Sequence, residues 1–170
     1  LGYVRRTLAL CPPSTRKLAY ETFIRSKLKY ASAIRSPHQA YLINTLESIQ
    51  NRAARFITSR YSSQESVSAI KSSLGLEPLL LRRKIAKLCL FYRLYYNFQQ
   101  LHGKLLIPPT RTSRRIFNSC SIQRLHGSTF SFSQSFFPSA VAEWNNLPDR
   151  VVSERNPIIF KQLLTDHLKL

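Results

Sequence analysis

The feature that most constrains the fold is an amphipathic stretch at residues 38–61, HQAYLINTLESIQNRAARFITSRY. Its apolar residues recur at the three-and-four spacing of one helical face. They are Leu42, Leu46, Ile49, Ala53 and Phe56, flanked by Tyr41, Ile43 and Ile57. The opposite face carries Asn44, Glu47, Asn51, Arg52 and Arg55. Because such a helix needs its apolar face buried, the sequence predicts that other helices pack around it.

Two further amphipathic segments supply those partners. Residues 14–33 form the first, with Ser14 as the expected N-cap and with Leu18, Phe23, Ile24, Leu28 and Ala31 as its apolar face. The short loop at Ser36-Pro37 predicts antiparallel packing against residues 38–61. A short helix at 64–74, with Gly75 as its C-cap, leads to the second segment at 79–98. Its apolar face is Leu81, Ile85, Leu88, Tyr92 and Tyr95.

The composition changes after Gly103, where Ser, Thr, Arg and Phe become frequent. We expect an irregular arm or hairpin, with the alternation at 130–133 forming a short strand and a tight segment at 144–148. Asn156-Pro157 begins a C-terminal helix. The predicted fold is therefore mainly α: an antiparallel helical bundle, an irregular basic arm with a short hairpin, and a terminal helix. The corresponding segments are a short lead-in at 1–13, the bundle at 14–100, the arm at 101–150 and the helix at 151–170.

The charge is the strongest indication of a partner. The chain has 26 Lys and Arg against 8 Asp and Glu, a net charge of +18 at pH 7. Such a balance favours a polyanion, above all nucleic acid, over a basic subunit whose charge has no dedicated ligand. No acidic residue lies between Glu77 and Glu143. Cations in the first turns of the 79–98 helix oppose the helix dipole, and either an external anion or exposure to solvent accounts for them.

We select eight basic residues of the two main helices and of the arm as candidate phosphate contacts. They are Arg52, Arg55, Arg82, Arg83, Lys84, Arg111, Arg114 and Arg115. The stretch 111–124 has no apolar period of its own, which makes it the best candidate for direct contact with a nucleic-acid backbone.

No pattern in the chain predicts catalysis. The only Asp residues are Asp149 and Asp166, and neither follows a strand pattern, so clustered carboxylates for two metal ions are missing. Cys11, Cys89 and Cys120 are too widely spaced for a zinc site and odd in number for a disulfide framework. We expect no catalytic residue, metal, cofactor or small-molecule substrate in this segment. We also expect no membrane span and an intracellular location, in the nucleus or the cytoplasm.

Several motifs, in order, resemble the region after the polymerase core of non-LTR (LINE-type) retrotransposon reverse transcriptases. They are LGYVRRTLALCPPSTRKLAYETFIRSKLKYASAIRSPH, LESIQNRAARFI, SLGLEPLLLRRKIAKLCLFYRL and SFFPSAVAEWNNLPDRVV. The similarity runs from Leu1 to about Leu164. The absence of Met and the start at Leu1 agree with a piece of a longer reading frame.

The resemblance implies a thumb and C-terminal region that grips a template–primer duplex of RNA and DNA. Residues 1–13 would then be the remnant of the junction between palm and thumb. The partners would be the duplex and the fingers and palm of the same polypeptide, which would hold the Mg²⁺ ions of the RNA-directed DNA polymerase. Two residues depart from the pattern: Arg35 stands where the family usually has Trp, and Ser26 where it has Pro. Two other interpretations are possible: a helical protein-interaction module, and a transposon remnant without function.

Overall fold

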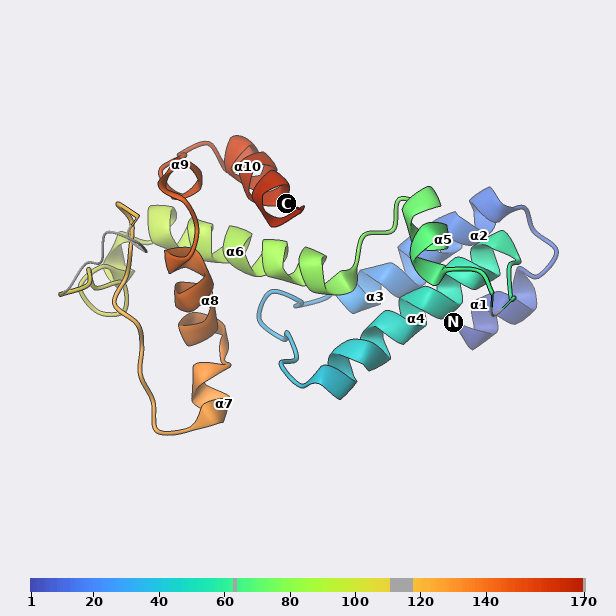
Figure 1. Ribbon diagram of the computed structural model, residues 1–170, viewed down its shortest axis with the longest axis horizontal. Helices are drawn as coiled ribbons and strands as arrows, with labels where there is room; N and C mark the ends of the chain where they lie inside the picture. The colour runs from blue at the N-terminus through green and yellow to red at the C-terminus, as the bar shows by residue number, and fades with distance from the viewer. Residues whose placement is uncertain (63, 111–117, 170) are drawn as a thin grey trace. The chain divides into compact units, whose positions relative to one another are not determined.

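The structure is a computed structural model that describes residues 1–62, 64–110 and 118–169. Helices dominate these residues, and no β-strand forms among them, so the predicted mainly α class is confirmed (Figure 1). The first half contains α1 (Gly2–Thr7), α2 (Pro13–Ala19), the π-helical turn η1 (Tyr20–Arg25), α3 (Ser26–Lys29), α4 (Ala40–Thr58) and α5 (Val67–Ser73). The second contains α6 (Leu79–Asn97), the 3₁₀ turn η2 (Gln99–Leu101), α7 (Phe130–Ser133), α8 (Phe136–Asn145), α9 (Asp149–Val152) and α10 (Pro157–Lys169).

The chain divides into two compact units, and the division falls inside α6. Unit 1 comprises Leu1–Ser32 and Pro37–Arg82, and unit 2 comprises Ala33–Ser36 and Arg83–Leu170. Only the first four residues of α6 belong to the unit that contains α4.

In unit 1, α2 and η1 pack antiparallel to α4, as the short connection between them predicts. Arg16 contacts Phe56, near the end of α4. Tyr20 comes after Arg16 in the chain but contacts Gln50, which comes before Phe56, so the two segments run in opposite directions. The buried cluster that results includes Tyr20, Ala53, Ala54, Ile57, Ile70 and Leu76. The predicted short helix is present as α5, which covers α4, and Gly75 follows it with a left-handed φ of 66°.

The first helical segment differs from its prediction at its start and in its buried face. It begins at Pro13, after an N-cap at Pro12, so Ser14 is not the cap. Proline is tolerated at the first helical position because no hydrogen bond needs its missing N–H there. The face that packs on α4 is offset from the predicted one, since Ala19 and Tyr20 are buried while Leu18 and Phe23 are exposed.

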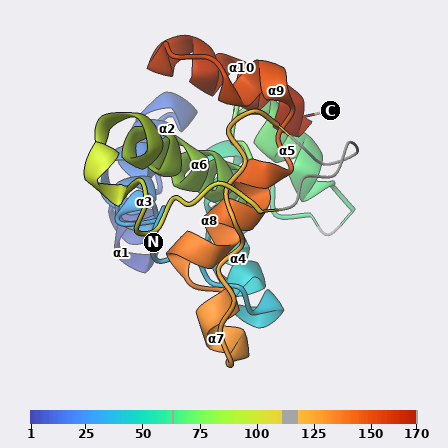
Figure 2. The same ribbon diagram turned by 90° about the vertical axis from the view of Figure 1, so that its left-hand side faces the viewer.

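Aromatic side chains form the core of unit 2, where α6 packs with α8 and α10. The Trp144 ring lies 5.4 Å from that of Phe91 and 5.5 Å from that of Tyr95, measured between centroids. The Phe160 ring of α10 stacks on Tyr92 at 4.2 Å. Figure 2, turned by 90° from Figure 1, keeps α8 and α10 on different sides of α6. The apolar stripe predicted on residues 79–98 thus serves mainly the core of unit 2.

The strand or hairpin predicted at residues 130–133 is wrong, because this segment forms the short helix α7. The Thr129 hydroxyl accepts a hydrogen bond from the Phe132 amide (3.3 Å), and the Ser133 hydroxyl donates to the Phe130 carbonyl (2.6 Å). Ser and Thr side chains that satisfy nearby backbone groups in this way favour a capped turn over a strand. An alternation of only four residues is too short to outweigh them.

Helix α8 was not predicted, since its segment was assigned to the irregular arm. Pro138 is the third residue of α8, where its missing N–H costs no hydrogen bond. The terminal helix α10 starts where Asn156-Pro157 predicted. The Asn156 side-chain oxygen accepts from the Ile158 amide at 2.9 Å, which caps the helix.

Candidate nucleic-acid interface

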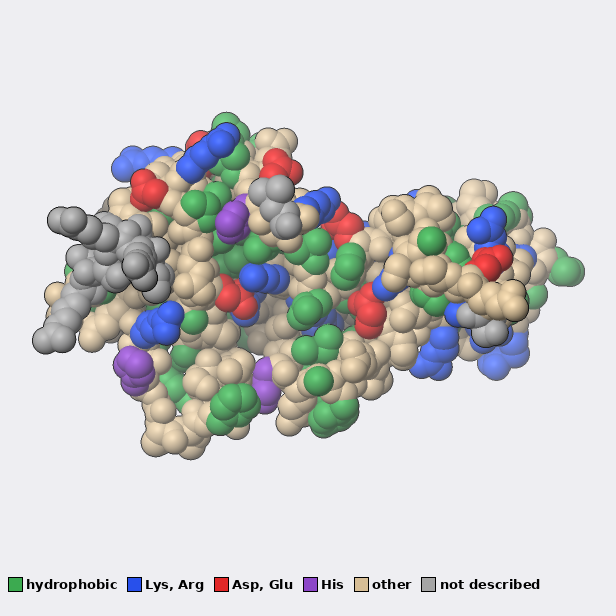
Figure 3. Space-filling view, in the orientation of Figure 1, with side chains coloured by type: hydrophobic (Ala, Val, Ile, Leu, Met, Phe, Trp, Pro, Cys, Tyr) green, Lys and Arg blue, Asp and Glu red, His purple; other side chains and the backbone are tan. Residues whose placement is uncertain are grey.

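Both units carry a large excess of positive charge. Unit 1 has 12 Lys and Arg against 4 Asp and Glu, and unit 2 has 14 against 4. Four ion pairs form among the described residues: Arg25–Glu21, Arg60–Glu65, Lys71–Glu47 and Lys87–Glu143. Most cations therefore have no carboxylate partner there. Figure 3 shows Lys and Arg side chains spread over both units on the visible face.

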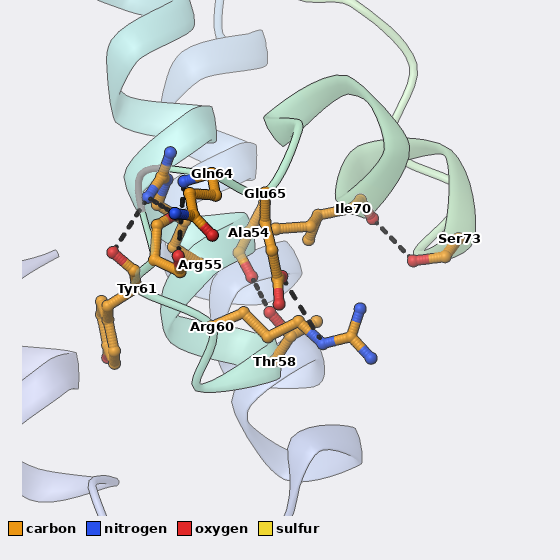
Figure 4. A network of polar contacts seen from close by, with 10 residues as sticks. Ala54, Arg55, Thr58, Arg60, Tyr61, Gln64, Glu65, Ile70 and Ser73 are labelled. Atoms are coloured by element: carbon orange, nitrogen blue, oxygen red, sulfur yellow. Dashed lines mark hydrogen bonds and ion pairs between the residues drawn. The ribbon is translucent and has the colours of Figure 1, made fainter.

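The two candidate residues of α4 differ in what their guanidinium groups do. Arg52 is exposed and folds back on its own helix, with Nη2 3.1 Å from the Ser48 hydroxyl. Arg55 is half-buried, and its Nη1 donates to the carbonyls of Tyr61 (3.2 Å) and Ser62 (2.9 Å), as Figure 4 shows for Tyr61. Residues three apart share a helix face, so the two groups are neighbours. Arg52 is available to a ligand, whereas Arg55 also fixes the loop after α4.

The end of α4 is held by a further cation that sequence reasoning did not select. Arg16 donates to the Phe56 carbonyl at 3.0 Å and to the Ser59 hydroxyl, and its guanidinium lies over the Phe56 ring. Ser59 has a left-handed φ of 55°, which closes the helix. A cation at a helix C-terminus is stabilised by the helix dipole. Nothing in the spacing of Arg16 distinguishes it from the other cations of its segment.

The three candidates at the start of α6 are half-buried and not equivalent. Arg82 belongs to unit 1, and Arg83 and Lys84 belong to unit 2. Arg83 donates to the Arg35 carbonyl at 3.2 Å, and burial lowers the pKa of its guanidinium. Consecutive helical residues point in different directions, so these three side chains do not form one patch.

The anion at the start of α6 comes from the chain itself. Glu47 Oε2 accepts from the Leu79 amide at 3.0 Å, while Glu47 Oε1 pairs with Lys71 at 2.6 Å. A carboxylate at a helix N-terminus is stabilised by the dipole that the nearby cations oppose. The basic first turns of α6 therefore do not require an external anion, although the sequence left that explanation open.

The candidates Arg111, Arg114 and Arg115 lie outside the described residues. The chain that follows them is anchored in unit 2 by the Trp-Asn-Asn motif. Asn118 is 2% exposed, and its Nδ2 donates to the carbonyls of Trp144 (3.1 Å) and Leu147 (3.0 Å). Asn145 bonds both backbone groups of Ile122, at 3.0 and 2.6 Å. The motif thus has a structural role that its sequence pattern alone did not reveal.

The titratable groups of unit 2 form no recognisable catalytic arrangement among the described residues. Tyr96 donates to the Val152 carbonyl at 2.6 Å and lies 3.8 Å from the Cys120 sulfur. Burial raises the pKa of Tyr95 to about 12 and raises the pKa of Tyr96 as well. Cys11, Cys89 and Cys120 are all free thiols. In the part of the chain that the structure describes, no three His, Cys, Asp or Glu side chains gather as metal ligands, and no helix is long and apolar enough to cross a membrane.

One pocket of unit 1 is apolar. It has a volume of about 500 Å³ and lies between α1, the helical run through η1 and α3, and Ile49 of α4. Tyr3 and Phe23 line it and are 72% and 66% exposed, and Lys27 contributes the one charged side chain. Such an open apolar surface fits a protein partner better than a small molecule.

Comparisons with known proteins add no identification. No protein-family model, curated protein or solved structure matches this chain.

Proposed function

We propose that this chain binds a nucleic-acid duplex through sequence-independent contacts to phosphates, as the thumb-like and C-terminal region of a LINE-type RNA-directed DNA polymerase. The observation that carries the binding proposal is the excess of cations without carboxylate partners on both units. A phosphate backbone neutralises such an excess and releases its own counterions, which drives association. The assignment to this polymerase family depends on the motifs of the sequence.

Four of the candidate cations form two groups for testing. Arg55 and Arg83 hold backbone carbonyls of their own units, so their replacement would also loosen the fold. Arg52 bonds only to Ser48 of its own helix turn, and Lys84 makes no hydrogen bond or ion pair with the described residues. Arg52 and Lys84 are therefore the residues whose replacement reports on binding with the least effect on stability.

The salt dependence of binding is the direct test. If about five of the cations bind phosphates, log K against log salt for a duplex should have a slope near −4 to −5. Replacing Arg52 and Lys84 by Gln should make the slope shallower by about 0.9 for each phosphate that the variant no longer neutralises. Fluorescence anisotropy with duplexes of two unrelated sequences measures both the slope and the lack of sequence preference. Arg150→Gln, at an exposed position of α9 outside the candidate set, is the control.

Two results would contradict the proposal. An affinity independent of salt would exclude phosphate contacts as the source of binding. A strong preference for one duplex sequence would exclude the sequence-independent mode. Polymerase assays on the 170-residue chain should show no synthesis, because the carboxylates needed to hold the metal ions are not clustered in its sequence.

The apolar pocket of unit 1 supports a second candidate, a helical protein-interaction module. Its exposed Tyr3 and Phe23 side chains would pack against an apolar partner. Light scattering with and without duplex separates the two functions. Oligomers that persist at high salt and do not respond to nucleic acid would favour the interaction module, whereas a monomer that binds duplex would favour the first proposal.

A further inference from the structure

Tyr61 presents an exposed aromatic ring beside a guanidinium group. The side chain is 56% exposed, and the Arg5 guanidinium carbon lies 5.8 Å from the centroid of its ring. Among the described residues a guanidinium covers a ring at one other place, where Arg16 lies over Phe56, and Phe56 is buried. Of these two rings, that of Tyr61 is therefore the one that a ligand can reach.

The backbone around Tyr61 is fixed from both sides. Arg55 Nη1 donates to the carbonyls of Tyr61 and Ser62, at 3.2 and 2.9 Å (Figure 4). On the other side, the Arg60 amide donates to the Arg55 carbonyl at 3.1 Å, and Ser59 adopts the left-handed conformation. A ring held on an ordered backbone loses little conformational entropy when a ligand stacks on it.

The charges near Tyr61 favour an anionic ligand. Arg5 is exposed and has no carboxylate partner among the described residues, and the Arg55 guanidinium reaches the Tyr61 and Ser62 carbonyls. The one carboxylate in this loop, Glu65, pairs with Arg60 at 3.8 Å. An aromatic ring with adjacent cations suits a nucleotide, because a base stacks on the ring while its phosphate meets the guanidinium groups.

We propose that Tyr61, supported by Arg5, is a stacking site for an unpaired nucleobase. This inference depends on the proposed function, and it adds a contact that a fully paired duplex does not offer. The preferred ligand is then a duplex with a single-stranded extension, since its first unpaired base can reach the ring. Stacking tolerates all four bases, so the preference is for an unpaired base rather than for a sequence.

The test compares a blunt duplex with the same duplex carrying a short single-stranded extension. The full chain, Tyr61→Leu and Tyr61→Phe are measured with both ligands, and Tyr41→Leu is the matched control. Tyr41 is also exposed, at 65%, and lies at the other end of α4. A fluorescent adenine analogue at the first unpaired position reports stacking directly, because its emission is quenched when it stacks.

The stacking site predicts that Tyr61→Leu weakens binding of the extended duplex roughly 5- to 150-fold, leaves the blunt duplex unchanged and abolishes quenching. Tyr61→Phe, which keeps the ring, and Tyr41→Leu should behave as the unsubstituted chain. An equal loss of affinity for both ligands, or no loss for either, would overturn the inference while leaving the duplex-binding function intact. A chain that binds neither ligand would overturn both proposals.

Discussion

Gln50 is a polar residue buried in the core of unit 1. Its side chain is fully buried, accepts from the Tyr20 hydroxyl at 3.1 Å and donates to the Glu77 carbonyl at 2.8 Å. The amide therefore connects three segments that are distant in the sequence. A buried polar group without a hydrogen-bond partner lowers the free energy of unfolding by about 1–3 kcal/mol. Removing the Tyr20 hydroxyl or the Gln50 amide would therefore leave a buried group of the other segments unpaired.

The burial of Tyr20 makes the stability of unit 1 sensitive to alkaline pH. Burial raises the pKa of the Tyr20 hydroxyl from 10.0 to about 12. A group whose folded pKa is raised contributes stability that is complete below its unfolded pKa and is lost as pH rises towards the folded pKa. The free energy of unfolding should therefore fall by about 1.4 kcal/mol per pH unit between pH 10 and 12 on account of this residue.

Urea unfolding followed by circular dichroism across that range measures the effect. Tyr20→Phe should be less stable at neutral pH, because it loses the hydrogen bond to Gln50, but its stability should decline less steeply above pH 10. Parallel pH profiles for the two proteins would show that Tyr20 ionises in the folded state as readily as in the unfolded one.

At the scale of elements, Glu47 joins α4 to α5 and to the start of α6. Its two oxygens pair with Lys71 and accept from the Leu79 amide. Glu47→Ala should destabilise unit 1 by about 1–3 kcal/mol, because it leaves a half-buried Lys and a helix N-terminus unsatisfied. Hydrogen exchange should be faster at the first turn of α6 than in wild type.

Glu65→Ala is the matched control, since it breaks the exposed pair with Arg60 and should change stability by less than about 0.5 kcal/mol. Equal effects of the two substitutions would mean that Glu47 acts as an ordinary surface charge. The sequence placed Glu47 on the polar face of its helix, and the structure shows that this part of the face is covered by α5.

At the scale of the molecule, two separate cores predict two unfolding transitions. Trp144 is the only tryptophan, is fully buried in unit 2 and therefore reports on that unit alone. Ile57→Ala, in the core of unit 1, should cost about 2–5 kcal/mol there. Part of the unfolding transition followed by far-ultraviolet circular dichroism should then shift to a lower midpoint. The midpoint of the transition followed by Trp fluorescence should not move. A single transition that shifts equally by both probes would show that the units unfold together.

Local patterns in the sequence were enough to predict the helical class and the positions of the long helices. The periods of α4 and α6 predict them within two or three residues, and Asn156-Pro157 predicts the start of α10. These features are local, because helical periodicity and capping depend on residues within a few positions of one another. The same locality explains the failures at 130–133 and at α8. There, side-chain hydrogen bonds in α7 favour a helical turn, and Pro138 falls in the first turn of α8, where proline is tolerated.

Which faces are buried, and which candidate cations remain available, follows from tertiary contacts alone. The predicted contact residues looked alike as basic side chains, yet Arg83 holds the distant Arg35 carbonyl of its own unit while Arg52 stays exposed. Tertiary contacts also place Gln50 in a core and divide α6 between two units. The physical reason is that a hydrogen bond or a buried contact joins residues that are far apart in the chain. Its partner cannot be read from the spacing of either residue.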